Sequence, residues 1–179
     1  METYTKFTFS EKRYNIWTMR SIYHNTPTIN GAEQLPGLEF KASSVNFSSS
    51  GGTSSLSLDI ASAYPADAKA RSYRRDFVFS AGKGLSLTDT FELSECTVPM
   101  EVNFLCYDKP EISGGRALLG GKAAMSFDDK IFTVAIDEIP LTDPKINNDW
   151  QKAYLYRLRL SMKNCELSGK LHFEFTRAN

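Results

Sequence analysis

The sequence predicts an all-β fold: a two-layer antiparallel β-sandwich, supersandwich-like, with about ten or more strands and little helix. Three observations predict it. Short segments alternate apolar and polar residues with period two. Glycine, proline and serine clusters separate these segments at regular intervals, and no stretch longer than a couple of turns has helical periodicity. Because one open sheet of so many strands tends to curl or split, two stacked sheets are expected.

The first two thirds of the chain supply four alternating segments. Turn residues before, between and after these segments predict hairpin tips or reversals, and Lys109-Pro110 predicts a break. One short helix is expected over residues 62–70, beginning near Pro65, since proline suits a first helical turn. The predicted strands cover residues 56–60, 85–87, 91–93 and 100–104, and the predicted turns cover residues 48–52, 81–84, 113–115 and 120–121.

The last third predicts three more strands, over residues 131–136, 154–160 and 171–175. In the second of these, Leu158 shares a face with Tyr156 and Leu160, whereas Arg157 and Arg159 share the other. In the last strand, Leu171, Phe173 and Phe175 are expected to point inward, and His172 and Glu174 outward. His172 is therefore interpreted as a solvated strand residue.

Length and charge limit the classes of function. The 179 residues fit one domain, residues 1–179, which is large enough to form a stable core without disulfides or metal ions. Lys plus Arg and Asp plus Glu are each 21, which argues against a nucleic-acid partner or an acidic membrane surface. No apolar run is long enough to span a bilayer, and the N-terminus lacks the apolar segment of a secretory signal peptide.

The three cysteines, Cys96, Cys106 and Cys165, contain no CxxC pair and form an odd set. Small buried thiols are the favoured interpretation, and Cys106 lies within the apolar alternation of a predicted strand. A bridge between Cys106 and either Cys96 or Cys165 is left open for an oxidising compartment.

Hydrolytic and phosphate-binding sites are not predicted. The acidic pairs Asp128-Asp129 and Asp137-Glu138 are interpreted as strand ends whose neighbours point to opposite faces, so neither pair converges on one bond. No GxSxG motif occurs, and residues 81–84 lack P-loop spacing. A basic cluster could match carboxylates or sulfates, although a solvated edge is favoured. This cluster contains Lys69, Arg71, Arg74 and Arg75.

His24 lies in an aromatic segment near the N-terminus, and the next histidine is His172, so no local metal motif of ordinary spacing is complete. Arg20 and Tyr23 lie beside it, together with Tyr14 and Trp17. Aromatic rings stack on the apolar faces of sugars, but core packing would use the same residues. His24 is therefore either a structural residue or part of a site that another domain completes.

The segment resembles a signature of the heparinase II/III-like polysaccharide lyases. Further segments of the chain match that family in the same order, namely residues 73–79, 89–91 and 109–110, then Trp150 and residues 156–160. The signature residues here are Arg20, His24, Asn25, Thr26, Asn30, Gly31 and Gln34.

This resemblance implies that residues 1–179 are the C-terminal β-sandwich of a larger lyase whose N-terminal α/α toroid is absent. Such enzymes cleave uronic-acid-containing polysaccharides by β-elimination, with the sugar held between toroid and sandwich. In the family, the acid tyrosine and the carboxylate-neutralising group come from the toroid, so this chain alone is expected to be inactive. The alternative is a stand-alone carbohydrate-binding or surface-interaction module without catalysis.

The resemblance also implies residue roles. Arg20, Tyr23 and Asn25 are expected to bind substrate, and His24 is expected to ligate zinc in the full-length protein. The other zinc ligands of the family, a His-x-His segment and an Asp, have no match here, so tight zinc binding by this chain is not expected. The expected partners are an acidic polysaccharide or oligosaccharide and the toroid, and the expected location of the parent protein is periplasmic or secreted.

Overall fold

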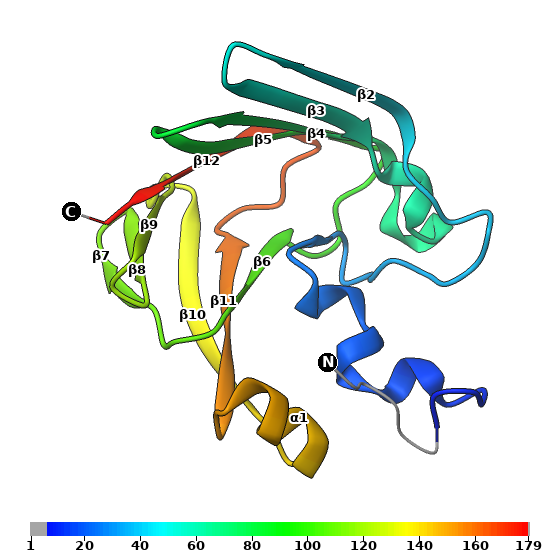
Figure 1. The fold of residues 1–179 in the computed structure, drawn as a ribbon. Helices are drawn as coiled ribbons and strands as arrows, with labels where there is room; N and C mark the ends of the chain where they lie inside the picture. Colours follow the sequence, from blue (N-terminus) through cyan, green and yellow to red (C-terminus); the bar gives the residue numbers. More distant parts are fainter. Residues whose placement is uncertain (1–6, 179) are drawn as a thin grey trace.

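A computed structural model describes residues 7–178 of the protein. Within these residues, twelve strands form two antiparallel sheets, accompanied by one α-helix (Figure 1). The small sheet has four strands in the order β1-β6-β11-β10, and the large sheet has eight in the order β2-β3-β4-β5-β12-β9-β8-β7. The predicted all-β, two-layer antiparallel architecture is confirmed.

The small sheet consists of β1 (Pro27–Thr28), β6 (Glu101–Cys106), β10 (Phe132–Pro140) and β11 (Tyr154–Met162). The large sheet consists of β2 (Ser43–Ser50), β3 (Thr53–Asp59), β4 (Ala70–Ser80), β5 (Gly84–Leu93), β7 (Glu111–Ser113), β8 (Arg116–Leu119), β9 (Ala123–Ser126) and β12 (Ser168–Arg177). Helix α1 spans Pro144–Trp150, and short 3-10 turns cover Arg13–Asn15, Trp17–Met19, Ser21–Tyr23, Ala61–Ala63 and Ala66–Ala68.

The main core lies between the facing sides of the two sheets. Leu158 and Leu160 of β11 and Phe173 of β12 are fully buried, as the alternation of each strand predicts. The ring of Phe104, on β6, lies 5.3 Å from that of Phe173, so aromatic packing joins the sheets directly. His172, on the other face of β12, is exposed and contacts Thr88 and Glu174, which confirms its interpretation as a solvated strand residue.

The prediction of a single helix over residues 62–70 is wrong. Two separate 3-10 turns form instead, because Pro65 between them has an extended backbone with ψ of 164°. Lys69 then adopts a left-handed conformation, which ends the second turn before β4 begins at Ala70. Helix α1, which the sequence analysis did not predict, starts at Pro144, where Asp143 accepts a hydrogen bond from the Lys145 N–H.

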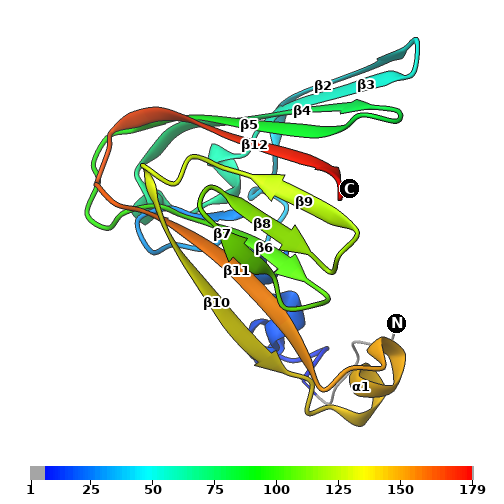
Figure 2. The same cartoon turned by 90° about the vertical axis from the view of Figure 1, so that its left-hand side faces the viewer.

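Several strand boundaries also differ from the prediction. The two segments at 85–87 and 91–93 belong to one strand, β5, because its ladder with β4 continues through the polar residues between them. The expected hairpin tip at 48–52 is shorter, because Ser49 and Ser54 pair across β2 and β3 at 2.9 Å between their hydroxyl oxygens. Figure 2 shows this hairpin extending beyond the small sheet.

A disulfide joins Cys96 to Cys165, whereas Cys106 is a buried free thiol. The interpretation as a buried thiol holds for Cys106 and is wrong for Cys96 and Cys165. The two bridged cysteines lie outside the strands. Cys96 lies between β5 and β6, and Cys165 lies between β11 and β12. Both connections cross from one sheet to the other, so the bridge fastens the sheets together at their crossovers.

Among residues 7–178, no helix is both long and apolar enough to cross a membrane.

Candidate functional site

The segment around His24 covers the outer face of the small sheet, the face that points away from the main core. It begins with the 3-10 turns Trp17–Met19 and Ser21–Tyr23. The Thr26 hydroxyl then donates a 2.6 Å hydrogen bond to the Ser21 carbonyl, which closes the second turn. The Tyr23 ring centroid lies 5.4 Å from the guanidinium carbon of Arg157, on the outward side of β11.

His24 is exposed, and its Nε2 lies 2.9 Å from the Thr18 carbonyl oxygen. Within the described part of the chain, no group of three or more His, Cys, Asp or Glu residues could hold a metal ion. His24 thus offers one nitrogen donor, and residues 7–178 do not by themselves complete a zinc site. Its role as a zinc ligand stays a prediction about the full-length protein.

Arg20 and Tyr23, two of the predicted substrate residues, have structural partners. The Nε of Arg20 donates to Glu33 Oε1 at 3.1 Å, and this hydrogen bond raises the pKa of Arg20 above its ordinary value. The ring of Tyr23 packs edge-on against that of Trp17, with 5.3 Å between centroids. Tyr14, the third predicted aromatic neighbour, is exposed. The structure therefore brings Trp17 and Tyr23 together and places Arg20 in an ion pair.

Asn25 ties the segment to both sheets. Its backbone is in the left-handed conformation, with φ of 58°. The Asn25 side-chain oxygen accepts a 2.7 Å hydrogen bond from the Leu105 N–H of β6, and its carbonyl accepts a 2.8 Å bond from Arg75 of β4. Asn25 is thus a structural link, and its substrate-binding role stays a prediction.

The later residues of the signature hold the loop in place. The Asn30 amide donates to the carbonyls of Ala68 and Glu95, and its oxygen accepts from the Thr97 N–H. The Gln34 N–H donates to the Ser21 hydroxyl at 3.0 Å. The Asn30 bonds explain the side-chain amide at that position, whereas Gln34 takes part through its backbone only, and none of these bonds requires a ligand.

Four aromatic side chains gather on this outer face, and we call Trp17, Tyr23, Tyr107 and Trp150 the aromatic platform. The set includes both tryptophans of the chain. Trp17, Tyr23 and Trp150 pack against one small apolar cluster, and the ring of Tyr107 lies 6.1 Å from that of Trp150. The cluster beneath them consists of Ile139, Leu141, Ile146 and Leu155.

Two cations lie over rings of the platform. Arg157 covers Tyr23, and the Nζ of Lys152 lies 4.5 Å from the Tyr107 ring centroid. Lys152 also forms an ion pair with Asp108. The platform thus combines flat apolar surface with positive charge, the combination that suits an acidic sugar.

Asp137 organises the charged network beside the platform. It accepts hydrogen bonds from Arg157 at 2.7 Å and from Arg159 at 3.1 Å, and Arg159 also pairs with Glu101. Burial disfavours the ionised form of Asp137, but the hydrogen bonds and charges of the two arginines outweigh it and lower its pKa. The interpretation of Asp137-Glu138 as a strand end is wrong, because both residues lie inside β10.

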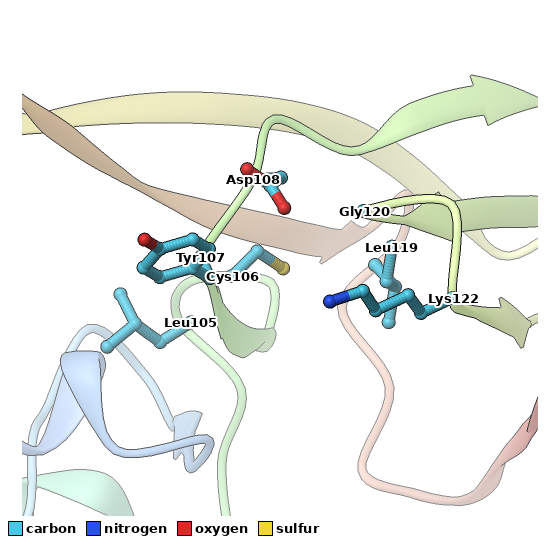
Figure 3. Close-up of a pocket in the computed structure, with 7 residues that line it drawn as sticks. All are labelled: Leu105, Cys106, Tyr107, Asp108, Leu119, Gly120 and Lys122. Carbon is cyan, nitrogen blue, oxygen red and sulfur yellow. The ribbon is translucent and has the colours of Figure 1, made fainter. Parts of the chain in front are cut away.

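A hollow of about 300 Å³ lies next to Tyr107 (Figure 3). Figure 3 shows the amino group of Lys122 reaching across it toward Tyr107 and Cys106. Burial raises the pKa of the Cys106 thiol to about 11, so the thiol is protonated at neutral pH and is not a nucleophile. The lining residues are Leu105, Cys106, Tyr107, Asp108, Leu119, Gly120 and Lys122.

Arg75 differs from the rest of the predicted basic cluster. Lys69, Arg71 and Arg74 are exposed, but Arg75 is only 5% exposed and pairs with the fully buried Asp89 at 2.8 Å. The interpretation of a solvated edge is therefore wrong for Arg75. The sequence signal was available, because Tyr73, Arg75 and Phe77 alternate on one face of β4.

No protein-family model matches the sequence, and no curated protein matches it significantly. Solved structures do match the fold. The heparan sulfate lyase HepC from Pedobacter heparinus matches with a TM-score of 0.71 and 12% identity, over 98% of this chain and 27% of that one. A heparinase III matches with a TM-score of 0.63 and 11% identity, over 94% of this chain and 26% of that one. The chain thus spans about a quarter of the length of these lyases and shares the fold of that part.

Proposed function

We propose that this chain is the β-sandwich wall of the substrate cleft in a polysaccharide lyase that cleaves uronic-acid-containing, glycosaminoglycan-like polysaccharides. The observation that carries the proposal is the fold shared with a heparan sulfate lyase across 98% of the chain. The aromatic platform supports it independently, because it offers sugar-sized rings beside Arg157 and Lys152.

The chemistry of the platform fits an acidic sugar. The rings can stack on the apolar faces of pyranoses, while the guanidinium and ammonium groups attract carboxylates and sulfates. Tyr107 is 45% exposed, so its ring is accessible from solvent. The ion pairs with Asp137 and Asp108 hold the cations in position before a ligand arrives, which reduces the ordering cost of binding.

Catalysis in the proposed reaction is β-elimination. A base removes the C5 proton of the uronate, a C4–C5 double bond forms, and the bond from C4 to the glycosidic oxygen breaks while an acid protonates that oxygen. We propose that the base, the acid and the group that neutralises the carboxylate lie in a toroid outside this chain, which alone gives no turnover. His24 would add one ligand to a zinc site that the full-length protein completes.

We propose a periplasmic or secreted location for the parent protein. The Cys96–Cys165 disulfide supports this, because structural disulfides persist in oxidising compartments.

A second candidate function is a stand-alone carbohydrate-binding module without catalysis. The platform favours it, because all four rings and both cations come from this chain. The two candidates share a binding face and differ in whether a catalytic partner is needed.

Binding is tested by titrating the protein with heparan sulfate oligosaccharides while following the fluorescence of the tryptophans, both of which lie in the platform. We expect a saturable change that weakens as salt increases. Arg157→Gln and Lys152→Gln should each weaken binding by about tenfold, the loss expected when one charged hydrogen bond to the ligand is removed. Lys83→Gln is the matched control, because Lys83 is exposed in the turn between β4 and β5.

Turnover is tested separately through the ultraviolet absorbance of unsaturated uronate products. The chain alone should give none, and a longer polypeptide that carries a toroid should give product. Robust turnover by the 179 residues would contradict the assignment of the catalytic groups to the toroid. Binding without turnover, even in the longest natural polypeptide, would favour the stand-alone module.

A further inference from the structure

The hollow of about 300 Å³ beside Tyr107 has one wall from each sheet, and we call it the Lys122 hollow. Residues 105–108, at the end of β6, form the wall on the side of the small sheet. Leu119, Gly120 and Lys122, in the turn from β8 to β9, form the wall on the side of the large sheet. The volume lies at the lower end of the range for small-ligand sites and suits one sugar unit.

The backbone holds Lys122 in a fixed position beside the hollow. Its N–H donates to the Leu119 carbonyl at 3.2 Å, and its carbonyl accepts a 2.9 Å hydrogen bond from the Ala178 N–H, directly after β12. The turn also packs closely against the opposite wall, because a Cβ on Gly120 would lie 2.7 Å from Asp108 Oδ2. The Lys122 side chain therefore extends from an anchored turn.

The amino group of Lys122 is accessible and is directed into the hollow. Lys122 is exposed, and Figure 3 shows its amino group extending toward Tyr107 and Cys106 on the opposite wall. Asp108 also lines the hollow, but its carboxylate pairs with Lys152. Burial raises the pKa of the Cys106 thiol to about 11, so the thiol adds no negative charge. The charge that a ligand meets in the hollow is therefore mainly that of Lys122.

Tyr107 connects the Lys122 hollow to the aromatic platform, because it belongs to both. Its hydroxyl donates to the Trp150 carbonyl at 2.9 Å, and the Nζ of Lys152 lies 4.5 Å from its ring centroid. These contacts fix the ring between the platform and the hollow. A sugar chain that lies on the platform would therefore have a neighbouring unit at the hollow.

We propose that the Lys122 hollow is a subsite for one anionic sugar unit, with Lys122 Nζ donating a hydrogen bond to a sulfate or carboxylate oxygen of that unit. The inference rests on the proposed function, because it extends the aromatic platform by one sugar. An ammonium group forms a charge-assisted hydrogen bond with either anion. A neutral sugar lacks this bond, so the hollow selects for charge.

The test is a ¹H–¹⁵N NMR titration with monosaccharides at constant pH and ionic strength. N-acetylglucosamine 6-sulfate carries a sulfate, glucuronate carries a carboxylate, and N-acetylglucosamine is the neutral counterpart of the first. We expect saturable shifts at the amides of residues 105–108 and 119–122, with an anionic sugar binding about tenfold more tightly than the neutral one. A response to only one of the anionic sugars would support the proposal and identify the anion.

Three variants make the result specific. Lys122→Gln changes an exposed side chain and should weaken binding of the anionic sugar by about tenfold. Lys122→Arg keeps the charge and should retain most of the affinity. Lys83→Gln removes the same charge from the exposed turn between β4 and β5 and should have no effect.

Three outcomes would overturn the proposal. They are equal binding of the neutral and anionic sugars, equal effects of Lys122→Gln and Lys83→Gln, and inorganic sulfate binding as tightly as the sulfated sugar, which would leave a site for a bare anion. Tryptophan fluorescence with the oligosaccharide separates this failure from that of the proposed function. A tryptophan response without monosaccharide shifts at the Lys122 hollow would overturn this inference alone, whereas shifts at the hollow without a tryptophan response would contradict the proposed platform.

Discussion

The two faces of strand β11 differ in what holds them in place. On the inner face, Leu158 and Leu160 are fully buried between the sheets. On the outer face, the side chains of Arg157 and Arg159 are 17% and 30% exposed and are held by Asp137. The inner face derives its stability from apolar burial, while the outer face presents ordered charge beside rings. One strand thus carries the apolar core on one face and the ordered charge of the proposed binding surface on the other, by the direction of alternate side chains.

Truncation of the inner face should have the largest effect on stability. Leu158→Ala removes a fully buried side chain and leaves a cavity, so we expect a loss of about 2–5 kcal/mol in the free energy of unfolding. Urea denaturation measures this loss. Glycan affinity of the folded variant should be unchanged, and a parallel loss of affinity would show that the two faces are coupled.

The disulfide should have the next largest effect. The disulfide links two residues that lie 69 positions apart in the sequence, and it thereby restricts the unfolded chain. The double variant Cys96→Ser with Cys165→Ser should therefore lower the free energy of unfolding by about 2–4 kcal/mol. Thermal unfolding of the variant, compared with the native protein under non-reducing conditions, checks this. A stability equal to that of the native protein would mean that core packing alone fastens the two sheets.

Removal of an outer-face charge should change stability least and should do so in a pH-dependent way. The pKa of Asp137 is lowered in the folded state, so its ionised form stabilises folding above the ordinary aspartate pKa of about 3.9. Asp137→Asn should therefore cost about 1 kcal/mol at neutral pH. The difference from the native protein should shrink as the pH falls through the lowered pKa, and unfolding curves at several pH values measure it. A difference independent of pH would exclude the ion pairs as its cause.

The alternation of polar and apolar residues was enough to predict the two-layer fold and the burial of Leu158 and Phe173. The alternation gave the wrong prediction where burial or pairing depended on residues that are distant in the sequence. Arg75 was read as a solvated cation because charged residues usually face water, yet its buried partner Asp89 lies on the neighbouring strand. The pairing of Cys96 with Cys165 depends on where two crossovers meet, which residue spacing does not encode.

The candidate site was predictable only in part. The sequence identified Trp17 and Tyr23 as neighbours of His24, because they are close along the chain. Tyr107, Trp150 and Lys152 reach the same face from distant positions, through the end of β6 and the end of α1. Local periodicity does not bring such residues together, so the aromatic platform emerged only from the tertiary structure.

The most direct test of the account is to locate the glycan on the protein by ¹H–¹⁵N NMR with a heparan sulfate oligosaccharide. Both tryptophan indole N–H signals, from Trp17 and Trp150, should shift saturably together with the Arg157 Nε–H, while the amides of Leu158 and Phe173 should shift little. Saturable shifts confined to the large sheet, with both indole signals unchanged, would contradict the claim that the outer face of the small sheet is the binding wall.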